Sequence, residues 1–308
     1  MTTHRAILIA GPTASGKSAL AIALARRHDG VVVNADSMQI YRDLEILTAR
    51  PSADELRQCR HALYGYVGGH EPYSVGRWLA DVKAVMEEQW RIGSLPVVVG
   101  GTGLYFKALL EGLSPIPSVP DAIRELWRGE ARRLAPAALH VVLEARDPVT
   151  AARLMPTDRQ RVTRALEVLD ATGRGLADWQ RQRDRPVLAA EDALLLVAAP
   201  ERAAIYARAD ERFDRMIAGG AIAEVERLAA RGYSDDLPIM RALGVVPLLA
   251  AQSGSLPLLQ AVRQANLDTR HYIKRQETWL RRNMIAWKRL STQQMEGFDE
   301  ESFTLIRL

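Results

Sequence analysis

Residues 6–18 read AILIAGPTASGKS, an apolar run followed by a loop with the spacing G-x-x-x-x-G-K-S/T. An apolar helical pattern then continues with Leu20, Ile22 and Leu24. A strand, this loop and a helix in that order predict a phosphate-binding loop. The residues that would contact the bound group are Gly11, Pro12, Thr13, Ala14, Ser15, Gly16, Lys17 and Ser18.

The residue types in this loop suit an anion. The glycines permit a tight turn whose N–H groups point inward, and the helix start adds unpaired N–H groups at the positive end of its dipole. Lys17 supplies a mobile positive charge, and the Ser18 hydroxyl can bind Mg²⁺. The loop therefore predicts binding of a diphosphate-like group. A glycine-rich turn with a chance lysine is the alternative, and the flanking strand and helix argue against it.

Composition limits the classes of protein. The 308 residues can hold one large or two modest domains, with 48% hydrophobic and 25% charged residues, which is ordinary for a soluble globular chain. The single cysteine, Cys59, excludes an internal disulfide framework and a cysteine-based zinc site. The N-terminus lacks a signal peptide's apolar core and no run reaches membrane-span length, so we expect a cytoplasmic protein without a membrane partner. A net charge of +4 is too small to identify a nucleic-acid partner.

Two further apolar runs end in residues with chemistry. The strand predicted at 31–36 ends in Asp36, and Val97 to Val99 leads into Gly100-Gly101-Thr102-Gly103. In open α/β sheets the carboxyl ends of the strands border the ligand crevice, so Asp36 and Thr102 should lie near the phosphate loop. The alternatives are structural: Asp36 could cap a turn, and Thr102 could be a helix N-cap.

The middle of the chain has a different character. Residues 112–120 contain three prolines and two serines, which indicates a linker-like break. Beyond it we expect amphipathic helices at 121–134 and 158–169, with 140–143 as the one strand-like run. We therefore predict an α/β core from residues 1–112 and 187–308, with a mainly helical insertion at 113–186. Three arginines near residue 160 are more often a solvated face than an RNA contact.

The C-terminal part carries positive charge on helices. After a strand at 193–198, Arg208 and Arg212 are helical neighbours, a costly pairing unless an anion lies between them. The last helix, predicted from Asn266 to about Leu290, carries seven basic residues with Trp279 among them. Basic side chains mixed with an aromatic suit a phosphate backbone and a stacked base, and a solvated surface helix is the alternative.

Six stretches, in this order, resemble the tRNA dimethylallyltransferases. They are residues 11–18 (GPTASGKS), 34–41 (NADSMQIY), 99–105 (VGGTGLY), 158–172 (DRQRVTRALEVLDAT), 205–216 and 274–280 (KRQETWL). Many families share the phosphate loop, whereas DSMQIY, GGTGLY and KRQxTW in one chain are highly specific. The resemblance covers most of the sequence.

The resemblance implies a P-loop NTPase-like parallel sheet whose loop binds the diphosphate of dimethylallyl diphosphate, with Mg²⁺ at Ser18. The reaction would move the dimethylallyl group to the N6 amine of the adenosine on the 3′ side of the tRNA anticodon, releasing diphosphate. Asp36 would accept the proton of the amine, and Thr102 and Arg212 would act at the diphosphate. The target base would be flipped out of its stack.

The same resemblance implies a tRNA-binding surface, with the insertion contacting the anticodon stem-loop. Its residues would be Asp36, Ser37, Met38, Gln39, Thr102, Arg124, Gln160, Arg161, Val162, Thr163, Arg164, Arg241, Lys274, Arg275, Gln276, Trp279 and Arg281. We expect the protein to act as a monomer.

Two stretches depart from the family pattern. Arg50 stands where the family usually has lysine, in a segment that also lacks the usual glycine before Thr48. After Gly244 the family continues with an aromatic and a basic residue, but here Val245-Val246-Pro247 follows, which leaves the tRNA contact near Arg241 open. The eukaryotic zinc module is absent, as in bacterial members.

Two other functions compete with this one. The phosphate loop alone would favour a small-molecule or nucleotide kinase, which has no use for the basic, aromatic C-terminal helix. A non-catalytic RNA-binding P-loop protein would make Asp36 dispensable.

Overall fold

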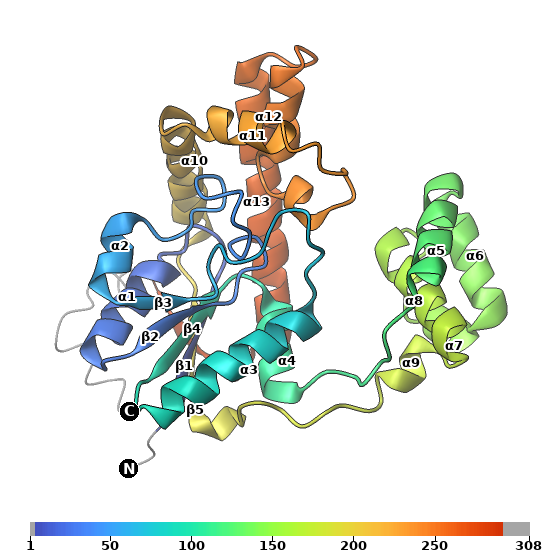
Figure 1. The fold of residues 1–308 in the computed structure, drawn as a ribbon, viewed down its shortest axis with the longest axis horizontal. Coiled ribbons are helices and arrows are strands. Elements are labelled where there is room, and N and C mark those ends of the chain that lie inside the picture. Colours follow the sequence, from blue (N-terminus) through green and yellow to red (C-terminus); the bar gives the residue numbers. More distant parts are fainter. Residues whose placement is uncertain (1–3, 292–308) are drawn as a thin grey trace. The chain divides into compact units, whose positions relative to one another are not determined.

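The computed structural model describes residues 4–291, which form two compact units. The first unit comprises the chain up to Leu110 and from Val187 onward, and the second comprises Glu111–Pro186. The first contains a six-stranded, all-parallel sheet in the order β3-β2-β4-β1-β5-β6 (Figure 1). Its strands are β1 (Ala6–Ala10), β2 (Val31–Asn34), β3 (Arg60–Ala62), β4 (Pro96–Gly100), β5 (Ala193–Ala198) and β6 (Lys288–Leu290).

The central strands are apolar throughout because helices cover both of their faces. The even-numbered residues of β1, such as Leu8, face α3 (Val75–Arg91) and α4 (Gly103–Glu111). Ile7 and Ile9 face α1 (Lys17–Arg27) on the other side. The phosphate loop therefore connects the central strand to a helix that packs on the same sheet.

A helical lobe completes the first unit. It contains α10 (Arg202–Ala218), α11 (Ala221–Ala229), α12 (Val245–Gln252) and the long helix α13 (Leu258–Asn283), with the short helix η2 (Pro238–Arg241) against α12. The short helices α2 (Ala53–Gln58) and η1 (Ala190–Asp192) lie instead against the sheet, at β3 and β5. A separate hydrophobic cluster joins this lobe to the segment after Asp36, through Ile40, Tyr41, Leu44 and Leu47. The lobe thus supports the loop that follows β2.

The second unit is entirely helical over its described residues. It contains α5 (Asp121–Arg133), α6 (Pro136–Arg146), α7 (Pro148–Ala151), α8 (Arg159–Thr172) and α9 (Leu176–Trp179). Its own core includes Trp127, Leu139, Leu143 and Leu166, and the Trp127 indole donates to Asp170 at 2.6 Å. Among residues 4–291, each helix is too short or too polar to cross a bilayer.

Two expectations about secondary structure were wrong. Residues 140–143 lie in α6, which begins with Pro136 at its first turn and buries Leu139 and Leu143 one turn apart, so the run is helical. The last helix ends at Asn283 rather than near Leu290. The chain then forms β6, which pairs in parallel with β5 and covers an edge of the sheet.

Candidate active site

The phosphate loop follows β1 and curls through two left-handed residues, Ala14 (φ 60°) and Gly16 (φ 88°). Lys17 begins α1, and its ammonium donates back to the Pro12 carbonyl at 3.1 Å. N–H groups in the first turn of a helix lack helical acceptors. The loop therefore presents several donors around one concave turn, which is the geometry of an anion site.

Two polar atoms beside this turn lack an internal partner. The Arg212 Nη2 donates to the Thr13 hydroxyl at 2.6 Å, but its Nε is buried without a hydrogen-bond partner among the described residues. The same holds for the Ser15 hydroxyl. Buried polar groups are normally hydrogen-bonded, so such groups in a phosphate loop indicate a place for a bound ligand.

Electrostatics link three residues across the turn. Burial lowers the pKa of the Lys17 ammonium to about 8, while the Asp36 carboxylate opposes the fall and the Arg212 guanidinium adds to it. Burial also lowers the pKa of Arg212, again opposed by Asp36. Two partly desolvated cations therefore share one carboxylate, and a diphosphate would relieve this excess of positive charge.

Asp36 is held by its own neighbourhood. Asn34, the last residue of β2, accepts from the Asp36 N–H at 2.8 Å and donates to the Asp36 carbonyl at 2.9 Å. The Trp78 indole donates to the Asn34 carbonyl at 2.9 Å. One carboxylate oxygen, Oδ1, accepts the Met38 N–H at 2.9 Å. Asp36 thus caps its own turn through Oδ1, whereas its Oδ2 has no hydrogen bond among residues 4–291.

Thr102 connects the two loops that follow β2 and β4. Its hydroxyl accepts the Ser37 N–H at 3.0 Å and donates to the Ser37 hydroxyl at 3.3 Å. Its own N–H donates to the Ala35 carbonyl at 3.2 Å. Thr102 therefore fixes the segment that carries Asp36.

Three tyrosines lie close enough to Asp36 for its charge to affect their ionisation. Burial raises the pKa of Tyr64, Tyr105 and Tyr272, and the nearby Asp36 charge adds to the rise in each. These phenols remain protonated at physiological pH.

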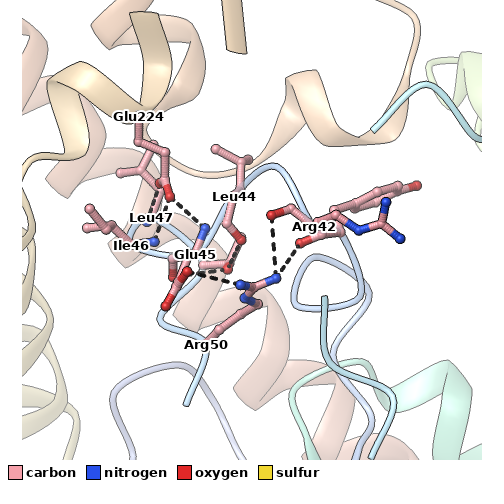
Figure 2. A network of polar contacts seen from close by, with 9 residues as sticks. Arg42, Leu44, Glu45, Ile46, Leu47, Arg50 and Glu224 are labelled. Carbon is pink, nitrogen blue, oxygen red and sulfur yellow. Dashed lines mark hydrogen bonds and ion pairs between the residues drawn. The ribbon is translucent and has the colours of Figure 1, made fainter. Parts of the chain in front are cut away.

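Glu224 of α11 holds the loop that follows Asp36 through hydrogen bonds to its backbone (Figure 2). The buried Glu224 carboxylate accepts three consecutive backbone N–H groups, from Glu45, Ile46 and Leu47, at 2.6–2.9 Å. From the other side Arg50 donates to the Tyr41 carbonyl at 3.2 Å and pairs with Glu45 at 3.1 Å.

Arg50 also explains Gly65. A Cβ at position 65 would lie 1.8 Å from the Arg50 Nη1, so the guanidinium occupies the space of a side chain. The arginine that departs from the family pattern is thus built into the loop by its own hydrogen bonds.

Helix α13 reaches the site through Gln276 and Trp279. Gln276 is only 6% exposed and bonds to both the phosphate loop and Gly101. Its carboxamide is therefore used inside the protein, and a tRNA contact by Gln276 stays a prediction. Trp279 is half-buried, with Gly103 against its ring.

The remaining predicted tRNA residues differ in exposure. Lys274, Arg275, Arg281 and Arg241 are exposed on the first unit. Arg241 and Arg275 line a groove of about 230 Å³ together with His271 and Pro247. This groove lies at the Val245-Val246-Pro247 departure, where Val246 is 63% exposed and Val245 is buried.

On the insertion, Gln160 and Arg161 are exposed, and Arg164 pairs with Glu167 at 3.2 Å. Arg124 is tied to Asp121 and to the Val119 carbonyl. Val162 is fully buried in the core of this unit, and the Thr163 hydroxyl donates to the Arg159 carbonyl. The side chains of Val162 and Thr163 thus lie on the inward face of α8, and tRNA contact by residues 160–164 stays a prediction.

Sequence reasoning missed the supporting roles of Asn34, Glu224 and Gln276. An asparagine that ends a run of valines is a usable signal, because a buried amide needs partners. Glu224 and Gln276 carry no such local signal, since their partners lie 177–179 and 175–263 residues away.

Two family models and curated relatives match this chain over most of its length. The IPP transferase family matches residues 39–283, and the isopentenyl transferase family matches residues 4–64. The chain is 55% identical over 288 residues to a tRNA dimethylallyltransferase of Methylobacterium sp., covering 93% of this chain and 94% of the relative. It is 51% identical over 284 residues to that of Azorhizobium caulinodans, covering 92% and 91%.

Solved structures give the same result. The tRNA isopentenylpyrophosphate transferase of Bacillus halodurans matches with a TM-score of 0.70 and 29% identity, covering 98% of this chain and 94% of that one. A eukaryotic dimethylallyltransferase acting on tRNA matches with a TM-score of 0.84 and 25% identity, covering 99% and 78%.

Proposed function

This chain belongs to the IPP transferase family, and from that membership we infer that it is a tRNA dimethylallyltransferase. The observation that carries the assignment is the convergence of three features at one end of the sheet. They are a phosphate loop whose Ser15 hydroxyl, like the neighbouring Arg212 Nε, has no hydrogen-bond partner among residues 4–291, a fixed carboxylate at Asp36, and a basic helix that bonds directly to the loop.

We propose the following division of labour. The allylic C–O bond of dimethylallyl diphosphate breaks as the C–N bond to the adenine N6 forms, and the leaving diphosphate gains charge. Lys17, Arg212 and the N–H groups of the loop stabilise that charge. The amine loses a proton, which the free Oδ2 of Asp36 accepts. The half-buried position of Asp36 keeps this carboxylate within reach of a flipped base.

The loop fits a magnesium ion held mostly by the substrate. The Ser18 hydroxyl lies exposed in the first turn of α1. Residues 4–291 hold no group of three acidic, histidine or cysteine side chains that could bind a metal alone. Mg²⁺ favours few protein ligands together with substrate phosphates and water, so Ser18 would supply one ligand and the diphosphate others. When bound, the ion would neutralise diphosphate charge.

We propose that tRNA lies along the exposed basic residues of α13 and the groove beside Arg241. Lys274, Arg275 and Arg281 are exposed on the helix whose Gln276 bonds to the phosphate loop. Gln160 and Arg161 would contact the anticodon stem-loop from the insertion. We further propose that the protein acts as a monomer in the cytoplasm.

The kinase alternative uses the same phosphate loop but leaves the basic helix unexplained. Relatives named for tRNA dimethylallyl transfer match more than nine-tenths of the chain, which weighs against a kinase.

A label-transfer assay tests the assignment. Purified protein, Mg²⁺, unmodified tRNA and radiolabelled dimethylallyl diphosphate are mixed, with ATP hydrolysis measured alongside. Label in the tRNA, without ATP consumption, is the expected result. Phosphate release from ATP without label in the tRNA would overturn it.

A further inference from the structure

A single carboxamide on α13 joins the two glycine-rich loops of the active site. The Gln276 Oε1 accepts the Thr13 N–H of the phosphate loop at 2.9 Å. Its Nε2 donates to the Gly101 carbonyl, in the turn after β4, at 3.0 Å. Both bonds are shielded, because Gln276 is only 6% exposed. Three segments far apart in the sequence are thus held by one side chain.

Gly101 and Gly103, in the turn after β4, lie where α13 comes close to the backbone, so a side chain at either position would collide with it. A Cβ at Gly101 would lie 2.3 Å from the Gln276 Nε2, and one at Gly103 would lie 2.2 Å from the Trp279 ring. Such distances are far below van der Waals contact. The Gly101–Gly103 turn is therefore shaped to receive α13, in addition to any role toward a substrate.

The bond to Thr13 also decides which loop donors remain for an anion. The Thr13 N–H is occupied by Gln276, whereas the Thr13 hydroxyl accepts from Arg212 and keeps its own hydrogen to donate. The backbone N–H groups left for a diphosphate lie further along the loop, toward Lys17. A shift of Gln276 would release Thr13 and alter this arrangement.

We propose that Gln276 is a positioning residue that locks the phosphate loop and the Gly101 turn onto the tRNA-binding helix, so that binding of the two substrates is coupled. The tRNA half of this inference rests on the proposed function. Lys274, Arg275 and Arg281 are exposed on the same helix. RNA that binds them and fixes α13 would therefore also fix the phosphate loop and the Gly101 turn, where dimethylallyl diphosphate is proposed to bind. Such coupling is reciprocal: each substrate raises the affinity for the other by the same factor.

Substituting Gln276→Leu tests the lock. It removes both hydrogen bonds at nearly constant volume and leaves buried partners unsatisfied. We expect the KM for dimethylallyl diphosphate to rise about tenfold, while the Kd for tRNA alone stays within about twofold. The matched control is Gln264→Leu on the same helix, an exposed glutamine that bonds only to Asp268 in the described structure, and it should behave as wild type.

Coupling is measured as the affinity for dimethylallyl diphosphate with and without unmodified tRNA. In wild type, tRNA should raise this affinity, and in Gln276→Leu the gain should disappear. A second variant, Gln276→Glu, keeps a hydrogen-bond acceptor for the Thr13 N–H but has no N–H to donate to the Gly101 carbonyl. Its affinity for dimethylallyl diphosphate should therefore fall as well. Should Gln276→Leu fail to fold, this second variant decides the question alone.

Two outcomes would overturn the proposal. One is an unchanged KM and unchanged coupling in a folded Gln276 variant. The other is weaker tRNA binding with normal donor affinity, which would make Gln276 an RNA contact. Titration with inorganic diphosphate and Mg²⁺ distinguishes a failure of this proposal from a failure of the proposed function. If Gln276 positions the phosphate loop, its variants should bind inorganic diphosphate more weakly than wild type, whether or not the protein transfers a prenyl group.

Discussion

Asp36 uses one carboxylate oxygen to cap its own turn and has the other available for a proton. The contact from Met38 to Oδ1 survives in an amide, so Asp36→Asn should keep the loop in place. Loss of a general base typically costs 10²–10⁴-fold in rate. We expect a loss of kcat in this range with tRNA affinity unchanged, measured by label transfer and filter binding.

The control for this variant is Asp29→Asn, which replaces an exposed carboxylate just beyond the far end of α1. It should keep the wild-type rate. Normal transfer by Asp36→Asn would mean that another group or solvent takes the proton.

Lys17 gives the donor site a pH dependence. Its pKa of about 8 means that the free enzyme loses this positive charge as the pH rises through that value. Under the proposed division of labour the Lys17 ammonium stabilises the diphosphate, so kcat/KM for dimethylallyl diphosphate should be level below pH 8 and fall above it, toward roughly tenfold per pH unit. Steady-state kinetics from pH 6.5 to about 9.5 check this.

The corresponding variant is Lys17→Arg, whose guanidinium stays charged throughout this window. It should be less active but show no fall near pH 8. An identical fall in both proteins would assign the titration to a different group.

At the scale of elements, the approach of α13 to α4 depends on Gly103. A methyl group there meets the Trp279 ring, so Gly103→Ala should destabilise the protein by about 1–3 kcal/mol. Gly129 is the contrasting case, because it lies inside α5 with open space around its Cα. Gly129→Ala should stabilise by about 0.5–1 kcal/mol. Thermal and urea denaturation measure both, and equal effects of the two substitutions would contradict the packing described.

Glu224 makes a second contact between elements, because it connects α11 to the loop at residues 45–47. Replacing it with glutamine removes one acceptor from three converging N–H groups, which should cost about 1–3 kcal/mol. The loosened segment contains Arg42 and Arg50, so trypsin should cut there faster than in wild type. Glu226→Gln, an exposed substitution on the same helix, is the control. Equal cleavage of the two variants would show that Glu224 does not hold this loop.

These elements also show what the sequence could predict. The phosphate loop, α3 and α8 follow from local patterns: Ser74 and Asp158 cap helix starts, and Gly173 ends a helix in the left-handed region. Strands β3 and β6 are three residues long and gain their stability from pairing with distant partners. No local pattern encodes such pairing.

The site likewise contains residues whose positions follow from local sequence patterns and residues whose positions depend on distant packing. The phosphate loop, Asp36 and Thr102 occupy strand ends, so topology alone predicts their proximity. Gln276 was expected to face RNA because the stretch that contains it, residues 274–280, resembles the tRNA-binding part of the family. Its inward position depends on the rotation of α13, which is fixed by Ile273 and Leu280 packing into the core.

At the scale of the whole molecule, positive charge should govern tRNA binding. The chain carries 41 basic and 37 acidic residues, so a net excess alone does not explain an RNA partner. If Arg281 neutralises one phosphate, Arg281→Gln should reduce the slope of log affinity against log salt by about 0.7–0.9. Arg227→Gln, on exposed α11 surface, should leave the slope unchanged. Equal slopes for the two variants would place Arg281 outside the interface.

The bond between Thr13 and Gln276 has a consequence for how the protein is made. Its partners are separated by 263 residues, so a nascent chain exposes the phosphate loop long before α13 has left the ribosome. The donor site reaches its final form only when nearly the whole polypeptide has been synthesised. Truncated translation products that lack α13 would therefore contain the phosphate-binding motif without the bond that holds Thr13 in the finished protein.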